Sequence, residues 1–230
     1  MIKFPAAKDQ PVIVLKYTGG FRAPDPVGFT PSPFLRVYAD GRVVTGQNEP
    51  KQPIFEVKLD PAEVEKLADF MVNVQKFNEL DSKKIAARIE AIPDRMQIAD
   101  APTTEITLTT EKGSHTCEVY ALGLAAREMK SIEEVGRLFK IEGRLKALHC
   151  IATLGLEKAD ALTAEANKFL QTNHPELKLQ MTKDDLRWVS KIGERTQISF
   201  VRDDTAEAEG AIVTIEQTAR GNSISVRDTK

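Results

Sequence analysis

Aromatic residues and cysteines are scarce in this chain of 230 residues, at 6% and two residues respectively. Two cysteines are too few for the disulfide scaffold of a small secreted domain. No apolar run approaches the roughly 20 residues that cross a bilayer, so no membrane span is predicted. The N-terminus also lacks a basic segment followed by an apolar block, as a signal peptide would have. We expect a cytoplasmic protein as written, or a periplasmic or extracellular one if a signal peptide was removed.

A charge excess is absent as well. The chain has 32 basic and 34 acidic residues. Residues 156–230 hold 11 of the basic and 13 of the acidic residues. Proteins dedicated to nucleic acid usually carry a strong basic excess that neutralises phosphates. The composition therefore argues against nucleic acid as a partner of either part of the chain.

The residues that are present predict a globular fold. Hydrophobic residues make up 41% and charged residues 29%, which is ordinary for a chain with a packed core. Clusters of short strands are followed by helices, which indicates an α+β class in which antiparallel sheets pack against long amphipathic helices. We place the boundary between two subdomains near Gly155, giving residues 1–155 and a smaller helix-plus-sheet subdomain, 156–230.

Local signals mark several element boundaries. Asp40-Gly41 predicts a hairpin turn, since glycine supplies the positive φ that such turns need. Asp60 followed by Pro61 predicts a helix start. From there, apolar residues at helical spacing predict one buried stripe, made of Val64, Leu67, Met71 and Val74.

The sequence also predicts the helices and strands of the second half of the chain. A long helix begins after Ser131 and ends at Gly155, a second helix covers 157–173, and three strands follow at 196–202, 211–218 and 223–227. Trp188, the single tryptophan, is expected to anchor the small C-terminal core, because aromatic side chains bury large areas.

One cluster of side chains has possible chemistry: His115, Cys117, His149 and Cys150. His115 and Cys117 share a face if they lie on a strand, and the four could form a metal site if the long helix packs on that strand. A Cys117–Cys150 disulfide and two buried free thiols are the alternatives. A catalytic cysteine is disfavoured, because Cys150 has apolar neighbours and Cys117 lies in mid-strand.

Two loops are the expected contact surfaces. Residues 19–33 hold three glycines and four prolines, and residues 203–210 are acidic. Loops on rigid scaffolds often carry recognition. The candidate binding residues are Phe21, Arg22, Phe29, Asp203 and Asp204.

Three short segments support a resemblance: Tyr17-Thr-Gly-Gly-Phe21, Val37-Tyr-Ala-Asp-Gly-Arg-Val43 and Asp100-Ala-Pro-Thr-Thr104. Over residues 11–150 they resemble a bacterial domain family of unknown function that is often found in exported proteins. The helix and antiparallel strands of 158–227 are similar in layout to cystatin-like and PepSY-like modules. The resemblance implies no activity and no catalytic residue.

The sequence thus favours an uncharacterised, soluble binding or interaction module, non-catalytic and without a cofactor, whose partner is another protein. The alternative is a hydrolase or metal-dependent protein that uses the His115, Cys117, His149 and Cys150 cluster. The sequence does not specify an oligomeric state.

Overall fold

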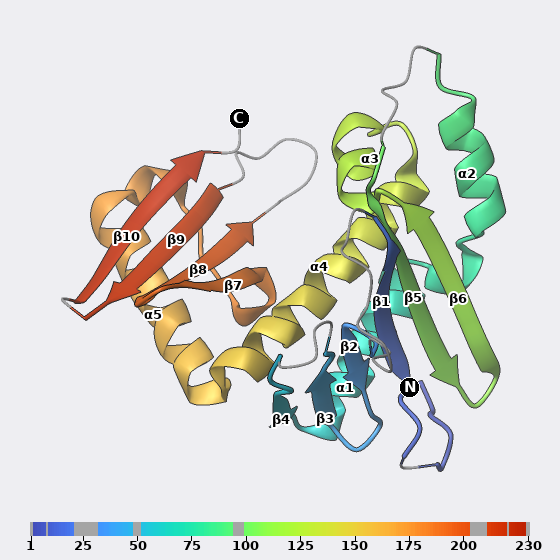
Figure 1. Cartoon of the computed structure of the whole chain (residues 1–230), viewed down its shortest axis with the longest axis horizontal. Helices are drawn as coiled ribbons and strands as arrows, with labels where there is room; N and C mark the ends of the chain where they lie inside the picture. Colours follow the sequence, from blue (N-terminus) through green and yellow to red (C-terminus); the bar gives the residue numbers. More distant parts are fainter. Residues whose placement is uncertain are drawn as a thin grey trace. The chain divides into compact units, whose positions relative to one another are not determined.

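The protein has an α+β fold, shown here by a computed structural model (Figure 1). The structure describes residues 2–7, 9–20, 32–47, 52–93, 99–202, 211–219 and 221–228. The chain divides into two compact units, residues 1–142 and 143–230. This division falls inside a helix, ahead of the boundary that the sequence suggests near Gly155.

Unit 1 is built on a six-stranded antiparallel sheet with the order β4-β3-β2-β1-β5-β6. Its strands are β1 (Ile13–Gly19), β2 (Leu35–Val37), β3 (Arg42–Thr45), β4 (Glu56–Lys58), β5 (Pro102–Thr110) and β6 (Gly113–Tyr120). Its helices and turns are α1 (Pro61–Asp69), the π-helical turn η1 (Phe70–Val74), the 3-10 turn η2 (Phe77–Glu79), α2 (Ser82–Glu90), α3 (Leu122–Glu128) and the first part of α4 (Glu133–Leu154).

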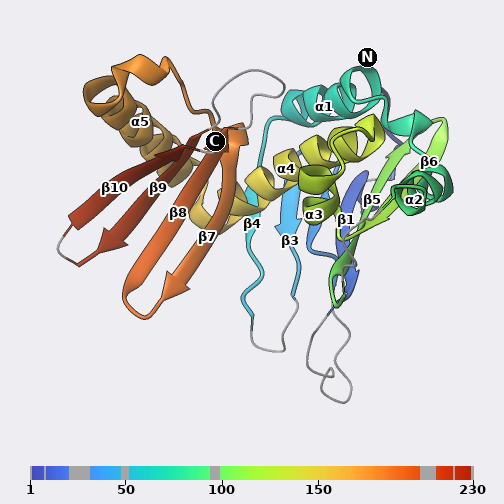
Figure 2. The ribbon, with the colours of Figure 1, turned by 90° about the horizontal axis from the view of Figure 1, so that it is seen from above.

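The core of unit 1 lies on one face of this sheet. Figure 2 shows α1, α3 and the start of α4 on the same side of the strands. Alternate strand residues, including Ile13, Leu15, Ile106 and Leu108, point to that side and are almost fully buried. The helix α2 lies beside the edge strand β6 (Figures 1 and 2). The alternation gives the sheet one apolar face and one polar face.

The predicted turn at Asp40-Gly41 and the predicted helix start at Asp60 are confirmed. Gly41 has φ +95°, and Tyr38 and Arg42 close the hairpin by a backbone hydrogen bond. The Asp60 carboxylate accepts the backbone N–H of Ala62 as an N-cap at 2.9 Å.

The stripe predicted for the first helix is correct except at its end. Val64, Leu67 and Met71 are buried, whereas Val74 is 59% exposed. The π-helical turn η1 is the reason, because it holds more residues per turn than an α-helix and rotates Val74 away from the stripe. The helix α3 was not predicted.

Unit 2 contains the rest of α4, then α5 (Leu156–Asn173), the 3-10 turns η3 (Pro175–Leu177) and η4 (Lys183–Asp185), and four strands. Gly155, with φ +84°, separates α4 from α5, as the sequence predicts. The strands are β7 (Leu186–Ile192), β8 (Arg195–Arg202), β9 (Ala211–Thr218) and β10 (Gly221–Asp228), in the antiparallel order β10-β9-β8-β7.

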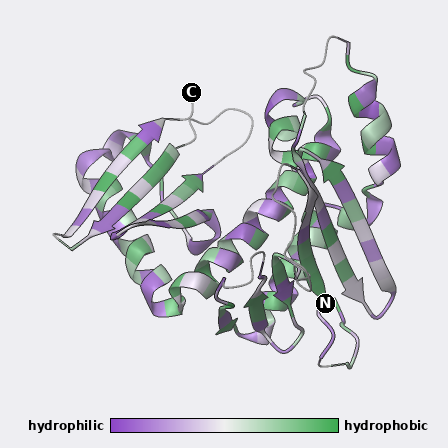
Figure 3. Cartoon of the chain, viewed as in Figure 1, coloured by the Kyte–Doolittle hydropathy of each residue, from purple (hydrophilic) through white to green (hydrophobic). Residues whose placement is uncertain are grey.

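The helix α5 covers one face of the unit 2 sheet (Figure 1). Its buried residues Leu162, Ala166 and Leu170 face a sheet side on which Phe200 and Val213 are fully buried. Figure 3 shows apolar and polar residues alternating along β9 and β10, as expected for a sheet covered on one side. The polar side is the one away from α5.

A side chain closes the connection between α5 and this sheet. The Asn167 amide donates to the Met181 carbonyl at 2.9 Å, and its oxygen accepts the Met181 N–H at 2.7 Å. The Asn167 side chain therefore pairs with both the N–H and the C=O of Met181, as the backbone of a neighbouring strand would. Thr182 and Asp185 follow directly and form a capping box at the start of η4.

The prediction that Trp188 anchors the C-terminal core is wrong. Trp188 lies on β7, a fourth strand that was not predicted, and is 43% exposed. A β-bulge lies between Leu186, which pairs with Phe200, and Trp188, which pairs with Ser199. The extra residue shifts the alternation, so Trp188 points away from the side that α5 covers.

Among the helices that the structure describes, none combines the length and the apolar character needed to cross a membrane.

The turn at Gly41 provides the first testable prediction. A Cβ at Gly41 would lie 2.2 Å from the Leu59 carbonyl oxygen, whereas one at Gly113 would meet nothing within 4 Å. Both glycines have positive φ, which costs an alanine about 1–2 kcal/mol. Gly41→Ala should therefore lower the free energy of unfolding by at least about 2 kcal/mol more than Gly113→Ala. Urea denaturation followed by circular dichroism measures both, and equal losses would contradict the close approach.

Candidate functional site

His115 and Cys117 lie on β6 and share a face, as predicted, but they hold the start of α2. His115 Nε2 donates to the Leu80 carbonyl at 2.9 Å, and its ring packs edge-on against Phe77, with centroids 5.2 Å apart. The Ser82 hydroxyl donates to Cys117 Sγ at 3.8 Å and accepts the Glu118 N–H at 2.9 Å. These contacts anchor the connection from η2 to α2 on the sheet.

The Cys117 thiol is buried within this anchor. Burial raises the pKa of Cys117 to about 11, against the opposite effect of the hydrogen bond from Ser82. At neutral pH the group is therefore a thiol, whereas nucleophilic attack and metal binding both need the thiolate.

His149 and Cys150 lie on the part of α4 that belongs to unit 2. Burial raises the pKa of Cys150 to about 12, although the charges of Arg187 and Lys146 act in the opposite direction. Burial also lowers the pKa of His149 to about 4, so its ring is neutral at physiological pH.

The two cysteines are free and buried, so of the two alternatives to a metal site the structure has the buried thiols and not the Cys117–Cys150 disulfide. Among the described residues, no group of three or more His, Cys, Asp or Glu side chains is placed to hold a metal ion. The metal interpretation of His115, Cys117, His149 and Cys150 gains no support from this part of the chain. The candidate binding residues Phe21, Arg22, Phe29, Asp203 and Asp204 lie outside the described residues.

A buried polar cluster in unit 1 was not predicted. Glu142 on α4 is 2% exposed, and its Oε1 accepts the Tyr17 hydroxyl at 2.9 Å and the Thr104 hydroxyl at 3.3 Å. Tyr17 and Thr104 are opposite each other on β1 and β5. Burial, and then the charge of Glu142, raise the pKa of Tyr17 well above its usual value. The tyrosine therefore stays protonated and ties α4 to the sheet.

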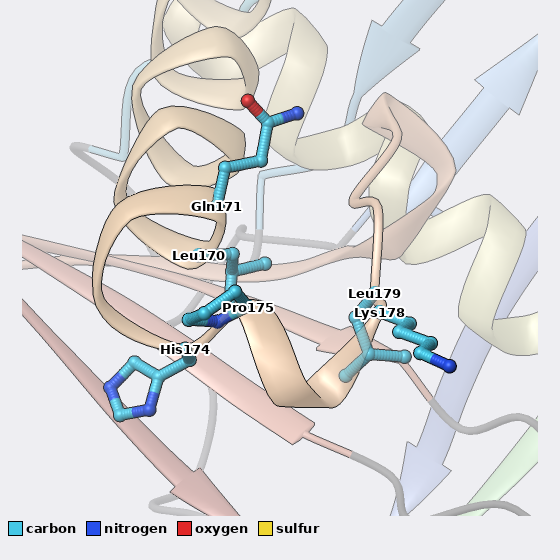
Figure 4. Close-up of a pocket in the computed structure, with 6 residues that line it drawn as sticks. All are labelled: Leu170, Gln171, His174, Pro175, Lys178 and Leu179. Carbon is cyan, nitrogen blue, oxygen red and sulfur yellow. The ribbon is translucent and has the colours of Figure 1, made fainter.

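A small hollow of about 160 Å³ lies at the C-terminal end of α5. Leu170, Pro175 and Leu179 form its apolar lining. Figure 4 shows that the polar side chains of Gln171, His174 and Lys178 point in different directions. They do not converge on one point, as the polar groups of a ligand site normally do.

The most exposed large aromatic surface on unit 2 is on the sheet side away from α5. There Trp188 lies opposite Ser199, which in turn lies opposite Thr214, and the neighbouring pair is Val201 and Ile212. We call these five residues the Trp188 face. Ser199 is fully buried, and its hydroxyl lies 3.2 Å from that of Thr214. Two paired hydroxyl groups thus lie at the cross-strand positions next to the exposed Trp188.

Contacts on β7 hold Trp188 in this position. The Arg187 guanidinium, at the bulge, donates to the carbonyl oxygens of Asp184 at 2.6 Å and Leu186 at 3.0 Å. Arg144 on α4 forms an ion pair with Asp184 at 2.8 Å. The bulge that turns Trp188 outward is thus fixed on its own strand and on α4.

No family model matches this chain, and no curated protein or solved structure matches it either. Its function must be inferred from its own geometry.

The raised pKa values of the two thiols make a direct prediction. In the native protein at pH 8, both Cys117 and Cys150 should react with a thiol reagent such as dithionitrobenzoate at least about 100-fold more slowly than an exposed cysteine, since the thiolate is the reacting form. The variant Ser114→Cys supplies that exposed cysteine on the same strand as Cys117. Unfolding in urea should release both native thiols. A native thiol that reacts as fast as the one introduced by Ser114→Cys would revive the catalytic interpretation.

The low pKa of His149 predicts an acid-sensitive stability. Unfolded histidine takes up a proton near pH 6.5, whereas buried His149 does so only near pH 4. The folded state therefore loses stability as the pH falls from 6.5 to 4, by about 2 to 3 kcal/mol. His149→Leu should flatten this part of the pH profile in urea denaturation.

His174→Gln is the matched control, because His174 is a partly exposed histidine of unit 2 that follows the last residue of α5. The loss of stability between pH 6.5 and 4 should persist in this variant, because His149 is intact. If His149→Leu retained the full loss between pH 6.5 and 4, other groups would be responsible for it.

Proposed function

We propose that this chain is a non-catalytic binding module whose partner is another protein, and that the Trp188 face is its contact surface. The observation that carries the proposal is the exposure of Trp188, 43% of which is accessible on a fixed strand. A large aromatic side chain is costly to leave in water, and tryptophan is among the residues most enriched at energetically dominant positions of protein interfaces.

The surroundings of Trp188 support this proposal. Half-buried Val201 and Ile212 lie on the same side of the sheet and extend the apolar centre. Exposed Arg195, Gln197 and Arg227 lie around this centre on neighbouring positions of β8 and β10. An apolar centre with a polar rim is the usual arrangement in non-obligate protein complexes.

The state of the thiols supports the non-catalytic part of the proposal. Cys117 and Cys150 are the strongest nucleophiles by residue type, and their raised pKa values keep them protonated at neutral pH. The contacts of His115 and Cys117 are accounted for by the anchoring of α2.

The loop residues named from the sequence are further positions to substitute in a test of the same proposal. The segment 203–210, with Asp203 and Asp204, connects β8 to β9, the strands that carry Val201 and Ile212. The segment that follows β1 holds Phe21, Arg22 and Phe29. Replacing each set separately tests whether that loop also binds the partner.

Loss of the indole should weaken partner binding strongly. We expect Trp188→Ala to weaken the binding of a purified partner at least about 30-fold, as for a dominant interface residue. The partner is first isolated on the immobilised full chain from an extract of the source organism, then purified and measured by titration calorimetry. The single tryptophan gives a second readout, because partner binding should protect Trp188 fluorescence from quenching by acrylamide.

Val74→Ala is the control, since Val74 is an apolar residue of unit 1 that is even more exposed. It should bind like the wild type. A partner that binds Trp188→Ala and the wild type equally would overturn the Trp188 face as the contact surface. A purified small molecule or nucleic acid that protects Trp188 where proteins do not would overturn the choice of partner.

A further inference from the structure

The two sheets have four edge strands, and three of them are protected against pairing with another chain. The strand β4 has only three residues. On β6, the Ser82 hydroxyl accepts the outward N–H of Glu118, and α2 lies alongside. The strand β7 is bulged at Arg187. Short length, cover and bulges are the devices by which proteins keep sheet edges from associating.

The fourth edge, β10, carries none of these devices among its described residues. Its eight residues pair with β9 in eight consecutive positions without a register shift. It contains no proline, and β9 is its one strand partner in the described part of the chain. A long, regular edge strand presents a row of N–H and C=O groups that can pair with a further strand.

The side chains of β10 differ on its two faces. Ile224 and Val226 are half-buried and lie opposite the buried Ile215 and Val213 of β9, on the side that α5 covers. Ser223, Ser225 and Arg227 lie on the other side and are exposed. The apolar core of unit 2 therefore continues to the edge of the sheet.

We propose that two copies of this chain associate by antiparallel pairing of their β10 strands, centred on Ser225. In this register Ile224 of one copy lies opposite Val226 of the other, and the reverse holds across the two-fold axis. The two half-buried apolar pairs then become buried on the α5 side. The same patch serves both copies, as a two-fold interface requires.

Charge complementarity supports the same register on the other face. There Arg227 of one copy lies opposite Ser223 of the other, and the next residue in that cross-strand row is Glu216 on β9. A long guanidinium side chain reaches over a serine to that carboxylate, which already lies 3.2 Å from Arg195. Glu216 would thus lie between two arginines, one from each copy.

If the pairing of the two β10 strands were centred on Ile224 instead of Ser225, the apolar and charged pairs described above would be lost. Val226 would then lie opposite Asn222, whose amide already donates to the Glu165 carboxylate on α5 at 2.9 and 3.0 Å. Arg227 would lie opposite Gly221. Pairing with a second copy in the Ser225-centred register is therefore the arrangement that best suits both faces of β10.

Directed cross-linking tests this register. In antiparallel pairing two directly opposite Cα atoms lie about 4.5–5.5 Å apart, which a disulfide can bridge. Ser225→Cys should therefore form a disulfide-linked dimer on mild oxidation, at least about tenfold faster than Ser223→Cys, whose position faces Arg227. The native thiols Cys117 and Cys150 are buried and should not contribute.

A charge exchange tests the same pairing without oxidation. In sedimentation equilibrium of the full chain over a concentration series, Arg227→Glu should weaken the dimer at least about fivefold. Adding Glu216→Lys should restore it, because the two residues meet only across the two copies. Trp188→Ala should leave dimerisation unchanged, so this result is independent of the partner proposed above.

Three results would overturn the proposal. The first is a chain that stays monomeric at all concentrations and whose Ser225→Cys variant forms no intermolecular disulfide. The second is equal cross-linking of the Ser223→Cys and Ser225→Cys variants. The third is a dimer that Arg227→Glu leaves intact, which would place the contact on another surface.

Discussion

The structure depends on one helix that serves two cores. The first part of α4 buries Val135 and Leu138 in unit 1, and the part after Glu142 buries Ala147 and Cys150 in unit 2. Glu142, a carboxylate, lies buried at the point of α4 where unit 1 ends, and the hydroxyls of Tyr17 and Thr104 donate to it. A buried carboxylate needs such partners, because its desolvation is costly.

Features set by neighbouring residues could be predicted from the sequence. The hairpin at Gly41, the N-cap at Asp60 and the break at Gly155 each follow from the conformational preference of one residue. The alternation that places His115 and Cys117 on one face is also correct. What they contact was not predictable, because the helix α2 that covers them comes from more than 30 residues earlier in the chain, and a single sequence carries no signal for that packing.

The errors share a physical origin in irregular elements. Val74 was assigned to a buried stripe, but a π-helical turn changes the angle between successive residues. Trp188 was assigned to the core, but one bulged residue, Arg187, reverses the faces of β7. Period-based reasoning assumes a constant repeat, so a single inserted residue moves a large side chain from inside to outside. Trp188 is expected in the core from its size alone, and the bulge in β7, a strand that the sequence does not predict, places it on the outer face instead.

The bulge in β7 has a consequence for the size of any assembly. A sheet with two open edges can add copies at both ends without limit, and such growth leads to fibres. Of the two edge strands of the unit 2 sheet, β10 is regular and β7 is bulged at Arg187. The Arg187 guanidinium donates to the Asp184 carbonyl and so fixes this bulge. Pairing through β10 occupies the regular edge of the unit 2 sheet in both copies. Association by this route is finite and stops at two.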